Sequence, residues 1–159
     1  NTMTVEIYSP VGANVTRETA TAEFKLGTRA YGQDNREFIY VQANGSIAVG
    51  DACGIDEDFQ AASLTTTTAA ALHSIGWASD HAFQNDYYGW LTVKGTNFTG
   101  NVKDNSSADA PLYTSATAGY LSTDSSTSNP VKVAGVTCVA VTSGGGASQL
   151  IAQFPFINE

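Results

Sequence analysis

The sequence carries little charge of either sign. Lys, Arg, Asp and Glu together make up 14% of its 159 residues, whereas about a quarter is usual in soluble proteins. Seven Lys and Arg against fifteen Asp and Glu give a net charge of -8, so the chain lacks the basic surface that binds nucleic acid. No apolar run approaches the roughly 18–20 residues that cross a bilayer. We therefore expect neither nucleic acid nor a membrane among the partners.

Cysteine is also scarce. Cys53 and Cys138 are the only two cysteines, and their separation matches none of the spacings that bind metal ions. Small or apolar residues flank both of them. We predict two reduced cysteines in the core, with a single disulfide as the alternative.

Hydroxyl-bearing and small residues take the place of charge. The chain contains 33 Ser and Thr, 22 Ala and 15 Gly. Its apolar residues form short runs bounded by turn signals such as Asn44-Gly45. This pattern predicts an all-β fold, a small β-barrel or sandwich of β-tulip-like plan. The expected strands are residues 38–41, 47–51, 53–55, 59–62, 87–93, 111–113, 131–141 and 149–154.

One stretch is ambiguous. Residues 64–73 read LTTTTAAALH, in which the alanines favour a helix and the four consecutive threonines do not. We predict an extended segment that continues to Ala78, with a short helical turn as the alternative.

The first 23 residues differ from the rest. Residues 2–8 alternate like a short edge strand, Pro10 interrupts them, and residues 15–23 are polar without periodicity. We predict an extended N-terminal arm over residues 1–23 that orders against another surface, and one β domain over residues 24–159. A faint similarity at an offset of 59 residues indicates two related β-units, about 46–95 and 105–155, with chance as the alternative.

The motifs for chemistry are weak. His73 and His81 lie near Asp80 and Asp86, which allows an acid–base site, but a polar hairpin between two strands explains the same residues. The carboxylates of residues 56–58 only half fit a calcium loop, because Phe59 and the missing distal Glu break the ligand pattern. Gly144, Gly145 and Gly146 lack the Lys that follows in a phosphate loop. We expect no catalytic residue, no cofactor and no metal site, and we expect that the protein is not an enzyme.

Three aromatic residues lie within the predicted strand of residues 87–93: Tyr87, Tyr88 and Trp90. At a period of two, Tyr88 and Trp90 share one face and Tyr87 points to the other. One face should pack inward and the other should expose an aromatic side chain. Such a side chain suits a protein partner or a sugar platform, which leaves a carbohydrate-binding or adhesive module as the alternative function.

Two runs resemble tailed-phage capsid decoration (cement) proteins. The first comprises Leu26-Gly27-Thr28, residues 40–43 and the stretch Ile47-Ala48-Val49-Gly50-Asp51, and the second comprises residues 109–121. The resemblance covers roughly residues 24–154. In general plan the chain is similar to the head-stabilising proteins of lambdoid phages, which sit as trimers at local three-fold positions.

The resemblance implies a structural role in the virion. The protein would be made in the host cytoplasm and would bind the outer surface of an assembled capsid, with the major capsid protein as partner and a homotrimer or other self-association on the shell. The N-terminal arm would grip the shell. The candidate capsid or subunit contacts are Val5, Ile7, Tyr8, Phe24, Tyr87 and Trp90.

Overall fold

The structure is a computed structural model that describes residues 13–158 except 72–73, 104–105, 127–128 and 141–143. The described residues form strands and one short 3-10 helix and contain no α-helix, so the all-β prediction is confirmed. The elements are β1 (Arg29–Tyr31), β2 (Glu37–Ala43), β3 (Ala52–Ile55), β4 (Gln60–Ser63), η1 (Thr68–Ala71), β5 (Ser74–Trp77), β6 (Tyr88–Val102), β7 (Pro111–Thr114), β8 (Leu121–Ser122), β9 (Lys132–Cys138) and β10 (Gly146–Asn158).

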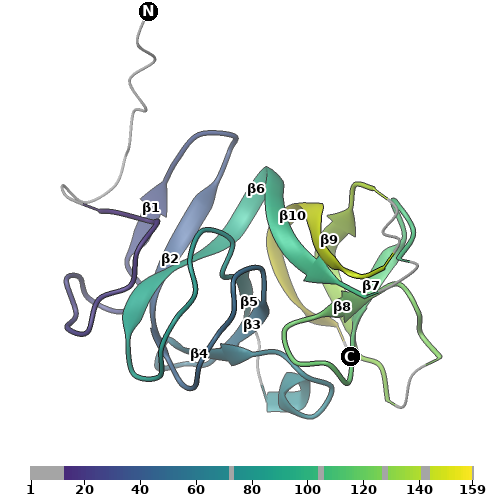
Figure 1. Cartoon of the computed structure of the whole chain (residues 1–159), viewed down its shortest axis with the longest axis horizontal. Helices are drawn as coiled ribbons and strands as arrows, with labels where there is room; N and C mark the ends of the chain where they lie inside the picture. The colour runs from purple at the N-terminus through teal and green to yellow at the C-terminus, as the bar shows by residue number, and fades with distance from the viewer. Residues whose placement is uncertain (1–12, 72–73, 104–105, 127–128, 141–143, 159) are drawn as a thin grey trace, which may run out of the picture.

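The strands pair into two closed rings that share β6 (Figure 1). Ring 1 consists of β2, β4, β3, β5 and β6, and ring 2 consists of β6, β8, β7, β9 and β10. The first half of β6 pairs with β2, and its second half pairs with β10. Because β6 changes partner along its length, it continues to Val102 beyond the strand end expected at Val93.

The two rings have the same pairing pattern. In each ring a parallel pair (β2–β4, β6–β8) is followed by antiparallel pairs in the same order. A shift of 59 residues converts the cross-strand pair Ile39–Leu91 of ring 1 into the cross-strand pair Phe98–Leu150 of ring 2. The common origin of the two units stays a prediction.

Each ring encloses a core, and a third cluster lies outside ring 1. Residues of β2 and β6 with odd numbers, such as Ile39, Val41 and Leu91, point into ring 1. Leu112, Val133 and Leu150 fill ring 2. Free Cys53 is buried in the first core and free Cys138 in the second. The even residues Tyr40 and Trp90 project from ring 1 to the outside and form the third cluster.

Two local predictions need correction: the short helical turn that was the alternative for residues 64–73 is present, and the strand expected at residues 47–51 is not. Residues 68–71 form a 3-10 helix, because Thr65 and Thr68 cap each other: the hydroxyl of each accepts the backbone N–H of the other, at 3.1 Å and 2.9 Å. Residues 47–51 form a turn instead of a strand. Only Ile47 makes a strand-like bridge, and the carboxylate of Asp51 accepts the N–H of Ala48 at 3.1 Å.

Candidate interaction surfaces

The segment of residues 13–26 lies across the outer face of ring 1. Val15, Phe24 and Leu26 pack on the third cluster, in which Phe24 contacts Tyr40 and Trp90. This segment is the dark purple chain beside β1 and β2 in Figure 1. We call it the docked segment. The described part of the predicted arm is therefore ordered against its own β domain.

Aromatic rings hold the docked segment in place. The ring of Phe24 meets that of Tyr40 edge-on with 5.4 Å between centroids, and it lies 5.4 Å from that of Trp90. Tyr40 and Trp90 are themselves 4.9 Å apart, and Tyr88 stacks on Tyr40 at 6.4 Å. Aromatic pairs at these separations contribute beyond their buried area.

Polar contacts fix the register of the docked segment. Thr19 and Tyr88 exchange two backbone hydrogen bonds of 2.9 Å each. The carboxylate of Glu18 accepts the backbone N–H of Gln84 at 2.5 Å, and the hydroxyl of Tyr40 accepts the N–H of Glu23 at 3.0 Å. These bonds satisfy backbone groups along a stretch that has little secondary structure of its own.

The docked segment covers the outward-facing aromatics of β6. Tyr88 and Trp90 do share a face, as predicted, but Trp90 is only 2% exposed because Phe24 lies over it. Phe24 is half-buried, and Tyr87, just before β6, is partly exposed. Trp90 therefore offers no surface for a partner or a sugar while the segment is docked. Val5, Ile7 and Tyr8 lie outside the described residues.

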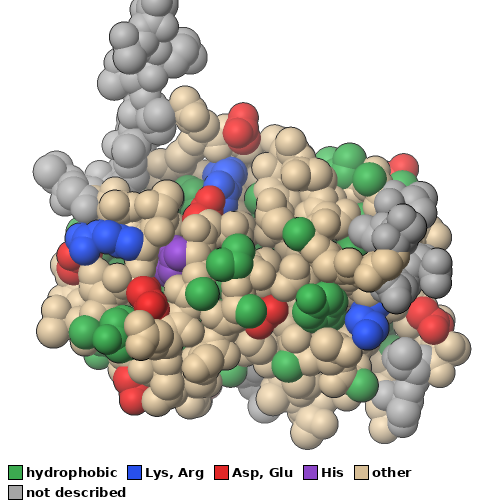
Figure 2. Space-filling model, viewed as in Figure 1, with side chains coloured by type: hydrophobic (Ala, Val, Ile, Leu, Met, Phe, Trp, Pro, Cys, Tyr) green, Lys and Arg blue, Asp and Glu red, His purple; other side chains and the backbone are tan. Residues whose placement is uncertain are grey.

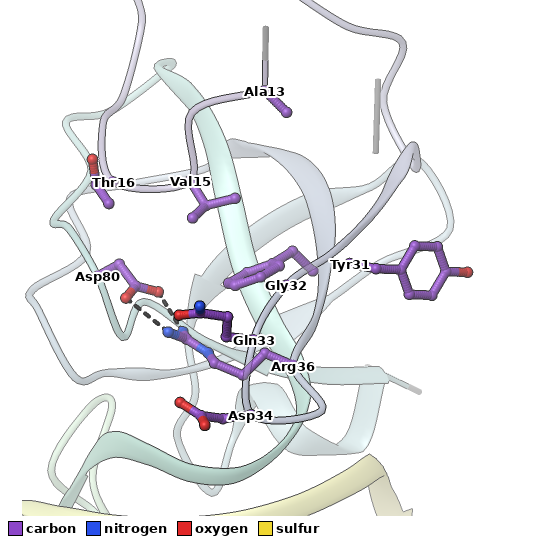
Figure 3. A pocket seen from close by; sticks show the side chains of 10 residues that line it. Ala13, Val15, Thr16, Tyr31, Gly32, Gln33, Asp34, Arg36 and Asp80 are labelled. Atoms are coloured by element: carbon purple, nitrogen blue, oxygen red, sulfur yellow. Dashed lines mark hydrogen bonds and ion pairs between the residues drawn. The ribbon is translucent and has the colours of Figure 1, made fainter. Parts of the chain in front are cut away.

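A cavity of about 260 Å³ opens where the described chain begins. Ala13 and Val15 form one side of it and Tyr31 and Gly32 of the β1 region form another (Figure 3). At its base Arg36 and Asp80 form a two-point ion pair, with one contact of 3.0 Å. This ion pair joins the turn after β1 to the turn after β5.

The residues considered for acid–base catalysis are engaged separately. Asp80 pairs with Arg36, and the carboxylate of Asp86 accepts the side-chain N–H of Asn85 at 2.7 Å. His81 is 8% exposed and its Nδ1 lies 2.8 Å from the carbonyl oxygen of Ala82. Its buried Nε2 has no hydrogen-bond partner in the structure. His73 lies outside the described residues.

The other candidate motifs form turns. Asp56 accepts the N–H groups of Asp58 and Gln60 at 3.0 Å and 2.8 Å, as in an Asx turn. In the described part of the chain no group of three His, Cys, Asp or Glu is placed to hold a metal ion. Gly144 and Gly145 precede β10 in the connection from β9.

Titration is perturbed at two described groups. Burial raises the pKa of the Cys53 thiol well above its ordinary value, and the nearby charge of Asp51 adds to the rise. The side-chain hydroxyl and backbone N–H of Ser126 lower the pKa of the exposed Asp124. Neither group faces a described cavity.

A second surface lies at one open end of ring 1. Phe154 and Phe156 of β10 are 43% and 48% exposed, and with Ile39 and Val93 they line a groove of about 160 Å³. We call this the Phe154 groove. Phe154 and Phe156 are exposed at the point where the pairing of β10 with β9 is irregular, between Ala152 and Phe156. Such bulges turn side chains outward, and Phe154 adopts a φ of 47° there.

Charges of both signs surround the Phe154 groove. The Lys94 ammonium and the Arg29 guanidinium lie 5.7 Å and 5.8 Å from the ring centroid of Phe154. Asp56 lines the groove, and Glu57 and Asp58 are exposed beside it. Among the described residues Arg29 pairs with Glu37, whereas Lys94 and the three acids form no ion pair.

Sequence reasoning missed the Phe154 groove, although a signal for it was present. Phe154-Pro155-Phe156 places a proline directly after the expected strand of residues 149–154 and inside β10 as it is found. Proline is confined to strand edges and bulges. The aromatics on either side of it mark two side chains at a period of two.

The face of the molecule seen in Figure 2 is poor in charge. Uncharged polar side chains and backbone predominate on it, with scattered acids and bases. No helix in the described part of the chain is long and apolar enough to cross a membrane.

No model of a known protein family matches the chain, and no curated protein is recognisably similar to it in sequence.

Proposed function

We propose that this protein is a structural virion protein that binds the outside of an assembled phage capsid and stabilises it. Its partner is the major capsid protein, and its copies associate on the shell as trimers or another oligomer. One observation supports this proposal most: the docked segment fixes Ala13 beside β1, five residues after the strand that the sequence predicts at residues 2–8.

An anchored, strand-forming terminus suits binding by strand addition. An extended segment that joins the edge of another sheet gains backbone hydrogen bonds, and its alternate side chains fill pockets. Val5 and Ile7 are alternate positions of this kind. The anchor lowers the ordering cost of the segment, because residues 13–26 are already fixed.

Stabilisation of a shell requires many weak contacts. Each copy binds the assembled state and not the free subunits, so binding shifts the equilibrium toward the shell. Copies linked through one shell act together. A surface with few charges is suited to lying permanently against other protein surfaces.

Co-sedimentation with bare capsids tests this proposal. We expect the full chain to sediment with purified shells and to raise the temperature at which they disrupt. A variant lacking residues 1–12 keeps Phe24 and the docked segment, and it should fold but fail to sediment. A second test variant replaces Val5, Ile7 and Tyr8 by Ser and should also fail to sediment. Its matched control replaces Thr2, Thr4 and Ser9 by Ala and should sediment like the full chain.

Two results would contradict the proposal. The first is a full chain that leaves bare shells unbound. The second is equal binding by the chain that lacks residues 1–12, which would show that the anchored terminus is not the contact.

A further inference from the structure

The Phe154 groove is too small for a typical small-molecule ligand. Its volume of about 160 Å³ falls below the roughly 300–1,000 Å³ of such sites. It is instead of the size that receives a single apolar side chain, as in the central pockets of protein interfaces. Two large exposed aromatics beside it, Phe154 and Phe156, supply side chains of the kind that fill such pockets.

The charges around the groove are self-complementary. Lys94 and Arg29 stand near Phe154, while Asp56 lines the groove with Glu57 and Asp58 beside it. A two-fold contact places each residue opposite a different residue of the other copy. The two cations of one copy can then face the acidic turn of the other, twice over. A ligand of single charge would meet repulsion on one side of the groove.

We propose that the Phe154 groove is a two-fold interface between two copies of this chain. Phe154 and Phe156 of each copy pack against the groove of the other. Lys94 and Arg29 of each copy pair with the turn of residues 56–58 of the other. The bulge in β10 is the device that turns these aromatics outward for the contact. This inference concerns the free protein and is separate from capsid binding.

The oligomeric state of the free full-length chain tests the proposal. Sedimentation equilibrium from micromolar to submillimolar concentration should show a monomer–dimer equilibrium whose Kd rises with salt, since the rim charges are screened. Phe156→Ser should raise the Kd about tenfold or more. Val139→Ser, at a site exposed to a similar degree (43%), is the control and should leave the Kd unchanged.

Charge reversal in two complementary variants gives a sharper test. Lys94→Glu alone and the double change Glu57→Lys with Asp58→Lys should each raise the Kd about tenfold, because like charges then meet twice across the two-fold axis. When the two variants are mixed, one rim keeps all its wild-type pairs, and at the other the reversed charge at position 94 faces the reversed charges at positions 57 and 58. The mixture should form a heterodimer with a Kd well below that of either variant alone, which a variant weakened by misfolding would not do.

Lys103→Glu is the matched control for Lys94→Glu. Lys103 directly follows β6 and lies nine residues beyond Lys94, which is about 30 Å along an extended strand. Its reversal should not affect the dimer.

Several results would overturn the proposal. They are a monomer throughout the concentration range, a trimer, a dimer insensitive to Phe156→Ser, and a mixture that fails to restore association. A dimer that leaves bare capsids unbound would support this interface and contradict the proposed function. A monomer or trimer that binds capsids would do the reverse.

Discussion

Asp51 is the residue on which most of the local structure between the rings depends. It is 6% exposed, and its carboxylate accepts hydrogen bonds from the N–H of Ala48, the hydroxyl of Ser63 and the amide of Asn101, at 3.1, 2.8 and 3.1 Å. Asn101 belongs to the second half of β6 and Ser63 to β4. The carboxylate therefore joins the turn before β3 to both rings.

Removal of this carboxylate should destabilise the fold strongly. Asp51→Ala removes the acceptor of three hydrogen bonds, of which the one from Asn101 is buried and the other two are partly buried, and each group left unsatisfied costs about 1–3 kcal/mol. Allowing for relaxation, we expect the free energy of unfolding in urea to fall by about 3 kcal/mol. Asp58→Ala, at an exposed turn position, should change it by less than about 0.5 kcal/mol. Equal effects of the two changes would contradict this role.

Cys53 should make stability depend on alkaline pH. Burial raises its pKa in the folded state, so the folded thiol stays neutral while the unfolded thiol ionises above its ordinary value of 9.0. Stability is therefore retained below pH 9 and is lost as pH rises above it, by up to about 1.4 kcal/mol per pH unit.

The comparison with Cys53→Ala isolates this effect. Other groups titrate in both proteins, so the difference between their slopes of unfolding free energy against pH from 8 to 10.5 belongs to Cys53. The wild type should have the steeper loss. Parallel slopes would show that the thiol ionises equally in both states.

At the scale of elements, the attachment of the docked segment to the outer face of ring 1 depends on Phe24. Phe24→Ala removes the ring that covers Tyr40 and Trp90. Because Phe24 is half-buried, we expect a loss of about 1–2 kcal/mol, below the 3–5 kcal/mol of a fully buried Phe. The fluorescence of Trp90 should shift to the red. The amides of Thr19 and Tyr88, which bond to each other, should exchange about tenfold faster or more.

Thr21→Ala provides the control for Phe24→Ala. Thr21 is exposed in the same segment, and its change should leave both amides protected. If Phe24→Ala instead accelerates exchange in the interior of ring 1 to the same degree, then the docked segment detaches only when the whole fold unfolds.

The elements show how far sequence reasoning reached. The short apolar runs at 38–41, 53–55 and 111–113 predicted β2, β3 and β7, because a run of this length between turn signals is typical of a strand. Residues 47–51 were misjudged because their apolar side chains hide a turn made by Asp51, whose hydrogen bonds reach across the chain. The 3-10 helix follows from reciprocal capping by Thr65 and Thr68, which propensity alone does not express.

The candidate surfaces were harder to predict than the strands. The shared face of Tyr88 and Trp90 follows from strand period, but its cover by Phe24 is a contact across more than 60 residues. The Phe154 groove depends on a bulge in β10 and on charges from β1, β6 and the turn between β3 and β4. Periodicity carries no information on either, because both arise from long-range packing.

The whole molecule is two rings that cannot separate, and this determines how it should unfold. β6 supplies a strand to both rings, and Trp77 of β5 in ring 1 packs its side chain into the core of ring 2 beside Phe98, with 5.2 Å between ring centroids. Neither ring can open without exposing the core of the other. The two units should therefore unfold as one cooperative body.

A substitution deep in ring 2 tests this coupling. Leu112 is fully buried there, and Leu112→Ala should cost about 2–5 kcal/mol. In native-state hydrogen exchange, the amide of Val41 in ring 1 should lose as much protection as the amide of Val133 in ring 2. The exposed Val139→Ala should leave both unchanged. Loss confined to Val133 would mean that ring 2 opens alone, with β6 held by ring 1. The shared strand would then join two independent units, contrary to the coupling that Trp77 imposes.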